Sequence, residues 1–182
     1  MLLFILIPFA LTIFWRRRVV PAFCSVDLYP LFAVEGIYLF FQITALCGYY
    51  GFVRYAALLQ AAFLLSLLLP VLRRKLYLPA LVGAGLTICG SLLNRLVIAA
   101  NGGKMPVRPS LSLWTGYYRP GMLEAGTDAL HIPMTDATRL NFLADYIDTG
   151  FSVMSIGDLL IHSFVSVIVF YTLKALPNTE KK

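Results

Sequence analysis

The feature that most constrains this chain is a series of five apolar runs, each long enough or nearly long enough to cross a membrane. A spanning helix needs about 20 mostly apolar residues. Hydrophobic residues make up 59% of the chain and charged residues 13%, against about 25% charged residues in a soluble domain. The composition excludes a soluble domain and predicts an all-α, integral membrane helical bundle. The predicted helices cover residues 1–15, 28–50, 52–72, 76–100 and 151–173.

The first apolar run resembles a signal peptide in length, and Pro8 interrupts it. A signal peptide carries its positive charge before the apolar run, whereas here Arg16, Arg17 and Arg18 follow the run. We therefore interpret residues 1–15 as a retained anchor whose N-terminus lies outside.

The cations predict the orientation of the bundle. When the five helices alternate in direction, nine of the fifteen Lys and Arg residues fall on one side. Cytoplasmic loops carry an excess of Lys and Arg, so the sequence predicts a multi-pass protein of the bacterial cytoplasmic membrane with a cytoplasmic C-terminus and loop 101–150 outside. The nine cations are Arg16, Arg17, Arg18, Arg73, Arg74, Lys75, Lys174, Lys181 and Lys182.

The sequence shows no internal repeat and predicts a single membrane domain over residues 1–182. In the long loop, Trp114, Tyr117 and Tyr118 are typical of side chains that rest on lipid headgroups. We expect short loop helices at residues 121–130 and 136–147, the second capped by Thr135.

The cysteine spacing and the distribution of positive charge indicate which ligands and partners to expect. Cys24, Cys47 and Cys89 lack a metal-binding spacing and fall at different membrane depths, so we expect neither a metal site nor a disulfide. The basic residues flank apolar runs, where anionic lipid accounts for them, which disfavours nucleic-acid binding. No motif identifies a cofactor. The expected partners are the lipid bilayer and either another membrane protein or a second copy of the chain.

Polar residues recur at helical spacing inside three of the predicted helices. Arg95 and Asp158 both fall in the outer halves of their predicted helices. We expect them to form an ion pair, because an unpaired charge there would be much less stable. Glu35 has no cation in its own layer, so it is either protonated or paired with residues 16–18. The aligned residues are Glu35, Tyr38, Gln42, Ala45 and Tyr49, then Ala80, Ala84, Thr87, Ser91 and Asn94, then Ser155, Asp158, His162 and Ser166.

Two motifs flank the long loop. The first consists of Asn101, Gly102, Gly103, Lys104, Met105 and Pro106. The second is Ser155-Ile156-Gly157-Asp158, and His131 and the segment 138–145, which ends at Asp145, lie between the two.

This order resembles a family of small bacterial multi-pass membrane proteins of unknown function, whose members carry Asn-Gly-Gly-x-Met-Pro after a late helix and Ser-Ile-Gly-Asp after a His and a Thr-x-Leu-x-x-Leu-x-Asp segment. The resemblance implies a topology and a shared site but no reaction. The specific part of the match runs from Asn101 to about Ile161.

Topology suggests that Asn101, Lys104, His131, Asp145 and Asp158 converge near Arg95. Three functions remain open. The first is a subunit or scaffold of a larger membrane assembly, in which the motifs shape the loop. The second is a membrane-surface enzyme that acts on a lipid-linked substrate through His131 with Asp128 or Asp145. The third is a small proton-coupled transporter component that uses Asp158, His162 and Glu35.

Overall fold

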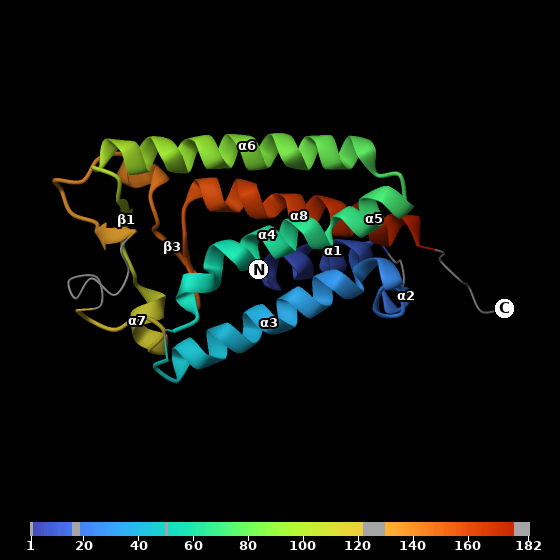
Figure 1. Ribbon diagram of the computed structural model, residues 1–182, viewed down its shortest axis with the longest axis horizontal. Coiled ribbons are helices and arrows are strands. Elements are labelled where there is room, and N and C mark those ends of the chain that lie inside the picture. The colour runs from blue at the N-terminus through green and yellow to red at the C-terminus, as the bar shows by residue number, and fades with distance from the viewer. Residues whose placement is uncertain (1, 16–18, 50, 122–129, 177–182) are drawn as a thin grey trace. The chain divides into compact units, whose positions relative to one another are not determined.

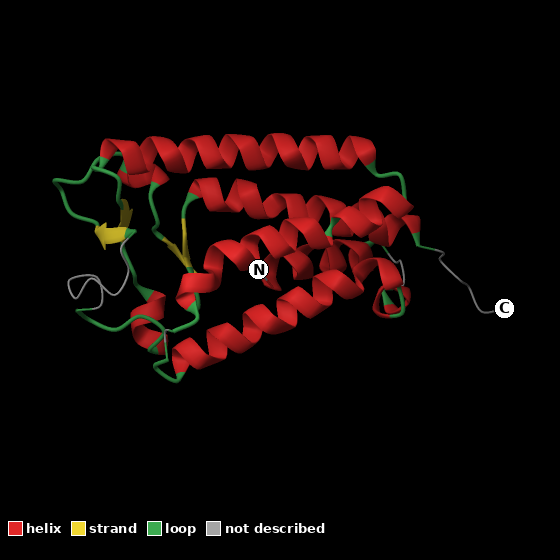
Figure 2. Ribbon diagram, viewed as in Figure 1, coloured by secondary structure: helices red, strands yellow, loops and turns green. Residues whose placement is uncertain are grey.

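Helices form most of the computed structural model, as the apolar runs predict (Figures 1 and 2). The structure describes residues 2–15, 19–49, 51–121 and 130–176. The main helices are α1 (Leu2–Phe14), α3 (Tyr29–Leu46), α4 (Ala56–Ser66), α5 (Leu68–Arg73), α6 (Tyr77–Ala100) and α8 (Ile156–Ala175). The short helices are α2 (Val20–Phe23), α7 (Leu111–Thr115) and the 3₁₀ turns η1 (Val26–Leu28), η2 (Val53–Tyr55) and η3 (Asn141–Leu143).

Among the described residues, three helical segments are long and apolar enough to cross a membrane: Val26–Leu46, Tyr77–Ala100 and Ile156–Ala175. The segments Leu2–Phe14 and Leu58–Arg73 are apolar but shorter. A bilayer's hydrocarbon core is about 30 Å thick, which about 20 helical residues match. The described chain is therefore mostly helical, its three apolar segments are compatible with a membrane protein, and the count of five spans stays a prediction.

Local chemistry explains where three helices depart from the predicted bounds. Helix α3 ends at Leu46, four residues early, because Gly48 adopts a left-handed φ of +89° and its N–H bonds to the Ala45 carbonyl. The predicted helix 52–72 is divided into α4 and α5 at Leu67. Pro70 lacks the N–H that would bond to the Ser66 carbonyl, which accounts for the break.

The start of α8 is also later than predicted, at Ile156 rather than Phe151. Residues just before it form a tight hairpin, in which β3 (Ile147–Asp148) pairs antiparallel with β4 (Val153–Met154). The Thr149 N–H bonds to the Ser152 carbonyl across the turn. The chain therefore reaches α8 in an extended conformation.

The loop between α6 and α8 contains strands where helix was expected (Figure 2). Strand β1 (Met105–Val107) pairs in parallel with β2 (His131–Pro133), and Val107 also bridges to Asp145. The predicted helix at 136–147 is wrong, because the chain there forms a turn, η3 and strand β3. The other predicted loop helix falls mainly on residues 122–129, outside the described part of the chain.

The chain forms two compact units. Unit 1 comprises residues 1–41, 50–85 and 162–182, and unit 2 comprises residues 42–49 and 86–161. In unit 1 the largest fully buried apolar side chains include Leu28, Leu31, Phe63, Leu67 and Ile168. In unit 2 a small core joins Val97, Met105 and Ala144, with Ile98, Met134, Leu140 and Leu143 packed against them.

Candidate functional site

A closed ring of hydrogen bonds in unit 2 links Asn94 of α6 to Ser155 and Asp158 at the start of α8. The Asn94 amide donates to Asp158 Oδ1 at 2.8 Å, and the Ser155 hydroxyl donates to Asn94 Oδ1 at 2.8 Å. The Asp158 N–H donates to Ser155 Oγ at 2.9 Å, and the Ser155 N–H donates to Asp158 Oδ2 at 3.1 Å. Ser155 and Asp158 thus form a capping box that begins the helix, and Asn94 joins it to α6.

Gly157 lies where the backbones of α6 and α8 meet. A Cβ added at Gly157 would lie 2.6 Å from the Gly90 carbonyl oxygen and closer still to the Asn94 side-chain oxygen. A Cβ at Gly90 would in turn collide with the Gly157 carbonyl oxygen. Only glycine fits at both positions, so the second motif provides a helix cap and a close helix contact.

The predicted ion pair between Arg95 and Asp158 does not form in the described part of the chain. The Asp158 carboxylate is bonded by Asn94 and by the Ser155 backbone instead. Arg95 is exposed on α6. Membrane depth does not specify the direction of a side chain around the helix axis, and Asn94 is the residue that faces the start of α8.

Asn101, the first residue of the other motif, clamps the loop to the end of α6. Its amide donates to the Val97 carbonyl at 2.9 Å and to the Arg139 carbonyl at 2.8 Å. The Arg139 N–H donates to Asn101 Oδ1 at 2.8 Å. The carboxamide therefore pairs with the Arg139 backbone as a neighbouring strand would.

The two glycines after Asn101 end α6 and turn the chain. Gly102 and Gly103 have left-handed φ angles of +64° and +85°, a conformation that costs glycine little. The Gly103 N–H bonds to the Ile98 carbonyl, and the Lys104 N–H bonds to the Asn101 carbonyl. These bonds satisfy the helix end.

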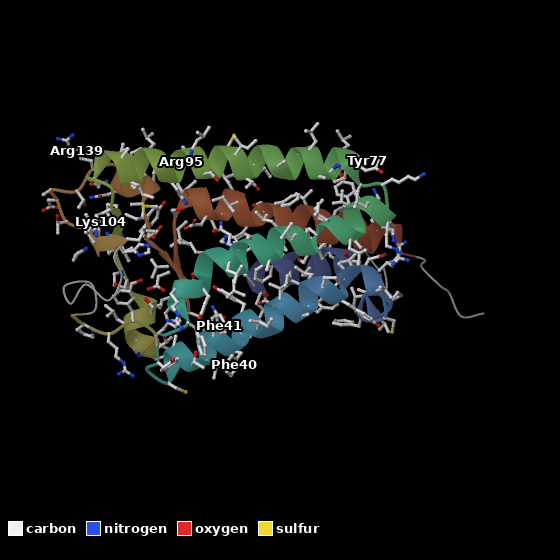
Figure 3. The ribbon with its side chains drawn as sticks, viewed as in Figure 1. Phe40, Phe41, Tyr77, Arg95, Lys104 and Arg139 are labelled. Atoms are coloured by element: carbon white, nitrogen blue, oxygen red, sulfur yellow. The ribbon has the colours of Figure 1, made fainter. Side chains whose placement is uncertain are left out.

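Met105, Pro106 and Val107 form the buried strand β1. The Met105 N–H bonds to the Leu130 carbonyl, and the Asp145 N–H bonds to the Pro106 carbonyl. This motif therefore supplies the central strand of the loop rather than a set of open polar groups. Figure 3 shows Lys104 and Arg139 at the Ala100 end of α6.

His131 and Asp145 are brought together, as the sequence suggested. His131 Nε2 lies 3.4 Å from Asp145 Oδ2, and the Asp145 side chain is buried whereas the His131 side chain is 28% exposed. A carboxylate beside an imidazole fixes the ring's orientation. Asp128, the other proposed partner of His131, lies outside the described residues.

Asp148 is a further organising residue of the loop that the sequence did not single out. Its Oδ2 accepts bonds from the N–H groups of Ser110 and Ser112, at 2.6 and 2.9 Å, and from the Ser112 hydroxyl at 2.7 Å. Its Oδ1 accepts the Gly150 N–H at 2.8 Å. Partial burial raises the pKa of the Asp148 carboxyl, but these hydrogen bonds outweigh burial and hold that pKa below its ordinary value.

A second cluster missed from sequence lies in unit 1, around the buried Asp27. Arg74 Nε donates to Asp27 Oδ2 at 2.7 Å, and Arg73 Nη1 lies 3.1 Å from Asp27 Oδ1. Arg74 also donates to the Ala175 carbonyl at 3.1 Å, and Ser25 Oγ donates to Asp27 at 3.2 Å. The Asp27 cluster joins the start of α3 to the ends of α5 and α8.

Some other polar residues of the helices make a hydrogen bond or a ring contact, but Glu35 differs from them. Gln42 donates to the Phe151 carbonyl at 3.2 Å in unit 2, and Ser166 donates to the Phe4 carbonyl at 2.7 Å in unit 1. The His162 ring packs on Phe4, with 5.2 Å between ring centroids. Glu35 is buried, and neither carboxylate oxygen has a hydrogen-bond partner within the described residues. Its suggested partners, residues 16–18, lie outside the described ranges.

The predicted site residues thus lie in unit 2 and mostly hold segments of the chain together. Over residues 2–15, 19–49, 51–121 and 130–176, no group of three or more His, Cys, Asp or Glu side chains is arranged to hold a metal ion. Residues 22–170 match the model of DUF5317, a family of unknown function. The chain belongs to this family. Whether its members share the two motifs stays a prediction.

A similar protein is known from Thermotoga maritima, where it is described as an uncharacterized protein. The two chains are 34% identical over 104 residues, which is 54% of this chain and 55% of the relative. The match therefore spans about half of each protein. No solved structure matches this chain.

Proposed function

We propose that this protein is a subunit or scaffold of a larger assembly in the bacterial cytoplasmic membrane. In this proposal the loop 101–150 lies outside and the C-terminus lies in the cytoplasm. The partner is another membrane protein or a second copy of the chain. Three apolar helical segments of spanning length support the membrane placement, and the biased distribution of Lys and Arg supports the orientation.

One observation carries the scaffold role: the polar side chains of the motifs are engaged in building the loop. Asn101 binds the backbone of two residues, and Asp158 and Ser155 cap α8 and bind Asn94. Polar side chains that are already hydrogen-bonded within the chain are typical of a structural role, because a catalytic group needs room for a substrate. The loop also exposes a large apolar side chain, Phe142 on η3, which is 65% exposed.

Membrane topology can be tested with the chain's own cysteines, since Cys24, Cys47 and Cys89 are all free and exposed. In single-cysteine variants, a membrane-impermeant maleimide added to intact spheroplasts should label Cys47. It should label Cys24 only after permeabilisation. Labelling of Cys24 before Cys47 would reverse the proposed orientation.

The partner can be sought with a photo-crosslinking amino acid at Phe142, with Leu81 as the matched control. Leu81 is exposed on α6 and should face lipid. We expect irradiation in cells to give one protein adduct from position 142 and lipid adducts from position 81. The proposal fails if position 142 gives no protein adduct and the gently extracted protein is a lone monomer by native mass spectrometry.

The pairing of His131 with Asp145 supports a second candidate, a membrane-surface enzyme acting on a lipid-linked substrate. In this alternative the imidazole acts as a general base and Asp145 orients it. His131→Gln would then abolish cellular function even where the variant stays folded, because Gln can still donate a hydrogen bond to the buried Asp145 carboxylate but cannot act as a general base. If function survives this substitution, the enzymatic alternative is excluded.

A further inference from the structure

Helix α6 has a packed face and an apolar exposed face. Gly90 and Asn94 contact the start of α8, and Val97 is buried in the core of unit 2. This spacing of three or four residues is that of one helix face. The opposite face is rich in large exposed apolar side chains, as expected where lipid covers a helix. They are Leu78, Leu81, Val82, Ile88, Leu92 and Leu96.

Arg95 interrupts this exposed face, between Leu92 and Leu96. The carboxylate expected to neutralise it, Asp158, is held by Asn94 and Ser155. Within the described ranges, Arg95 forms no hydrogen bond or ion pair. The described residues therefore supply no counter-charge to the guanidinium group.

The position of Arg95 along α6 indicates where a counter-charge would lie. Helix α6 has 24 residues, so its length is about 36 Å at 1.5 Å per residue. Arg95 is then about 10 Å from the helix midpoint, whereas the hydrocarbon boundary lies about 15 Å from the bilayer centre. An arginine side chain is long enough to cover the remaining 5 Å or so and reach the headgroups.

We propose that Arg95 binds the phosphate of a membrane phospholipid in the leaflet at the Ala100 end of α6. This inference rests on the membrane placement proposed above, but not on the scaffold role. Arginine presents a planar fork of donors that matches two phosphate oxygens. At this depth on a lipid-facing surface, the anions within reach of the Arg95 side chain are the phosphodiester groups of the surrounding phospholipids.

A second exposed arginine is held at the same end of α6. The Arg139 backbone is fixed by Asn101, six residues beyond Arg95, and Figure 3 shows Arg139 at this helix end. Arg139 lies on the aqueous side of the boundary in the proposed placement, so it adds a longer-range attraction to the same anion. Its removal should weaken lipid binding less than removal of Arg95.

The test uses the purified full-length protein in micelles of a non-ionic detergent, titrated with phosphatidylglycerol and followed by native mass spectrometry. We expect the dissociation constant to rise about tenfold in Arg95→Gln, the usual size of a charge-assisted hydrogen bond, and less in Arg95→Lys. Arg108→Gln, which removes another exposed arginine of unit 2, should bind as the unaltered protein does. Diacylglycerol, which lacks the phosphate, should not compete.

Circular dichroism should show Arg95→Gln to be as helical as the unaltered protein, so that lost binding is not lost folding. The proposal is overturned if Arg95→Gln binds phosphatidylglycerol normally, or if inorganic phosphate displaces the lipid at equal concentration. It is also overturned if Arg95 is needed for a stoichiometric protein complex that carries no phospholipid. Extraction of the protein from membranes by alkaline carbonate would instead refute the membrane placement itself.

Discussion

Asp27 in unit 1 and Asp158 in unit 2 are carboxylates that their units hold in different ways. In unit 1, Asp27 is only 2% exposed and meets two arginine side chains. In unit 2, Asp158 meets a neutral amide and a backbone N–H. Ion pairs depend on charge and tolerate some variation in geometry, whereas the hydrogen bonds of a helix cap depend on direction. The contrast indicates that the Asp158 site depends on fixed geometry and that the Asp27 site depends on charge.

The largest effect is expected at the contact between α6 and α8. Gly157→Ala would place a Cβ against the Gly90 carbonyl and the Asn94 side chain, so we expect a loss of about 3 kcal/mol of stability. Gly85→Ala is the control, since a Cβ there meets nothing within 4 Å. Thermal unfolding in detergent measures both, and equal melting temperatures for the two variants would show that the helices are not in close contact.

Removing the charge of Asp27 tests unit 1. Asp27→Asn leaves Arg73 and Arg74 without their buried partner, and breaking a buried pair typically costs 3–5 kcal/mol. Because both arginines retain solvent contact, we expect about 2 kcal/mol. Arg73→Gln, which removes the more exposed cation, should cost less than about 1 kcal/mol. If Asp27→Asn melts at the same temperature as the unaltered protein, the Asp27 cluster does not fasten unit 1.

Loss of the Asn101 clamp should loosen the loop while the helices remain. Asn101→Ala removes three hydrogen bonds, for which we expect about 2 kcal/mol of local opening free energy. Hydrogen exchange of residues 138–145 should then become faster by more than tenfold, with α8 unchanged. Asn101→Asp keeps the acceptor for the Arg139 N–H and should give a smaller increase. Unchanged exchange in Asn101→Ala would show that Asn101 does not hold the loop to the end of α6.

The smallest effect is a pH dependence at Asp148. Its folded pKa is depressed, so its stabilising contribution is fully present above the ordinary Asp pKa of about 3.9 and is lost as the pH falls through the lower folded value. Proteolysis of segment 110–116 should therefore rise only below about pH 4. Asp148→Asn should be susceptible at neutral pH and show no further change in this range. Susceptibility that rises between pH 5 and 7 would point to another group, such as His131.

The sequence predicted the helices that begin and end with a change in composition. The bounds of α1 and α6 match within about one residue, because basic residues or glycines limit their apolar runs. The start of α8 was placed too early, because Phe151 to Met154 are apolar but extended. The expected helix at 136–147 failed because the Thr138 and Asn141 side chains bond to the Thr135 carbonyl, which competes with helix formation.

The hydrogen bonds that connect the predicted site residues were not predicted, and their role as a site stays a prediction. Ser155 and Asp158, three residues apart, carry the signature of a capping box, and both of its hydrogen bonds form. The contact of Asp148 with Ser112 joins positions 36 residues apart, and that of Asp27 with Arg74 joins positions 47 apart. No local pattern in one sequence specifies such pairs, because they depend on how the segments pack.

The most direct test of the architectural role of the motifs is a double-mutant cycle between Asn94 and Asp158. Unfolding free energies would be measured for Asn94→Ala, Asp158→Ala and the double variant. We expect a coupling of about 1–2 kcal/mol, with cellular function declining in step with stability. A coupling near zero, with function lost in a stable Asp158→Ala protein, would contradict it and assign Asp158 to chemistry instead.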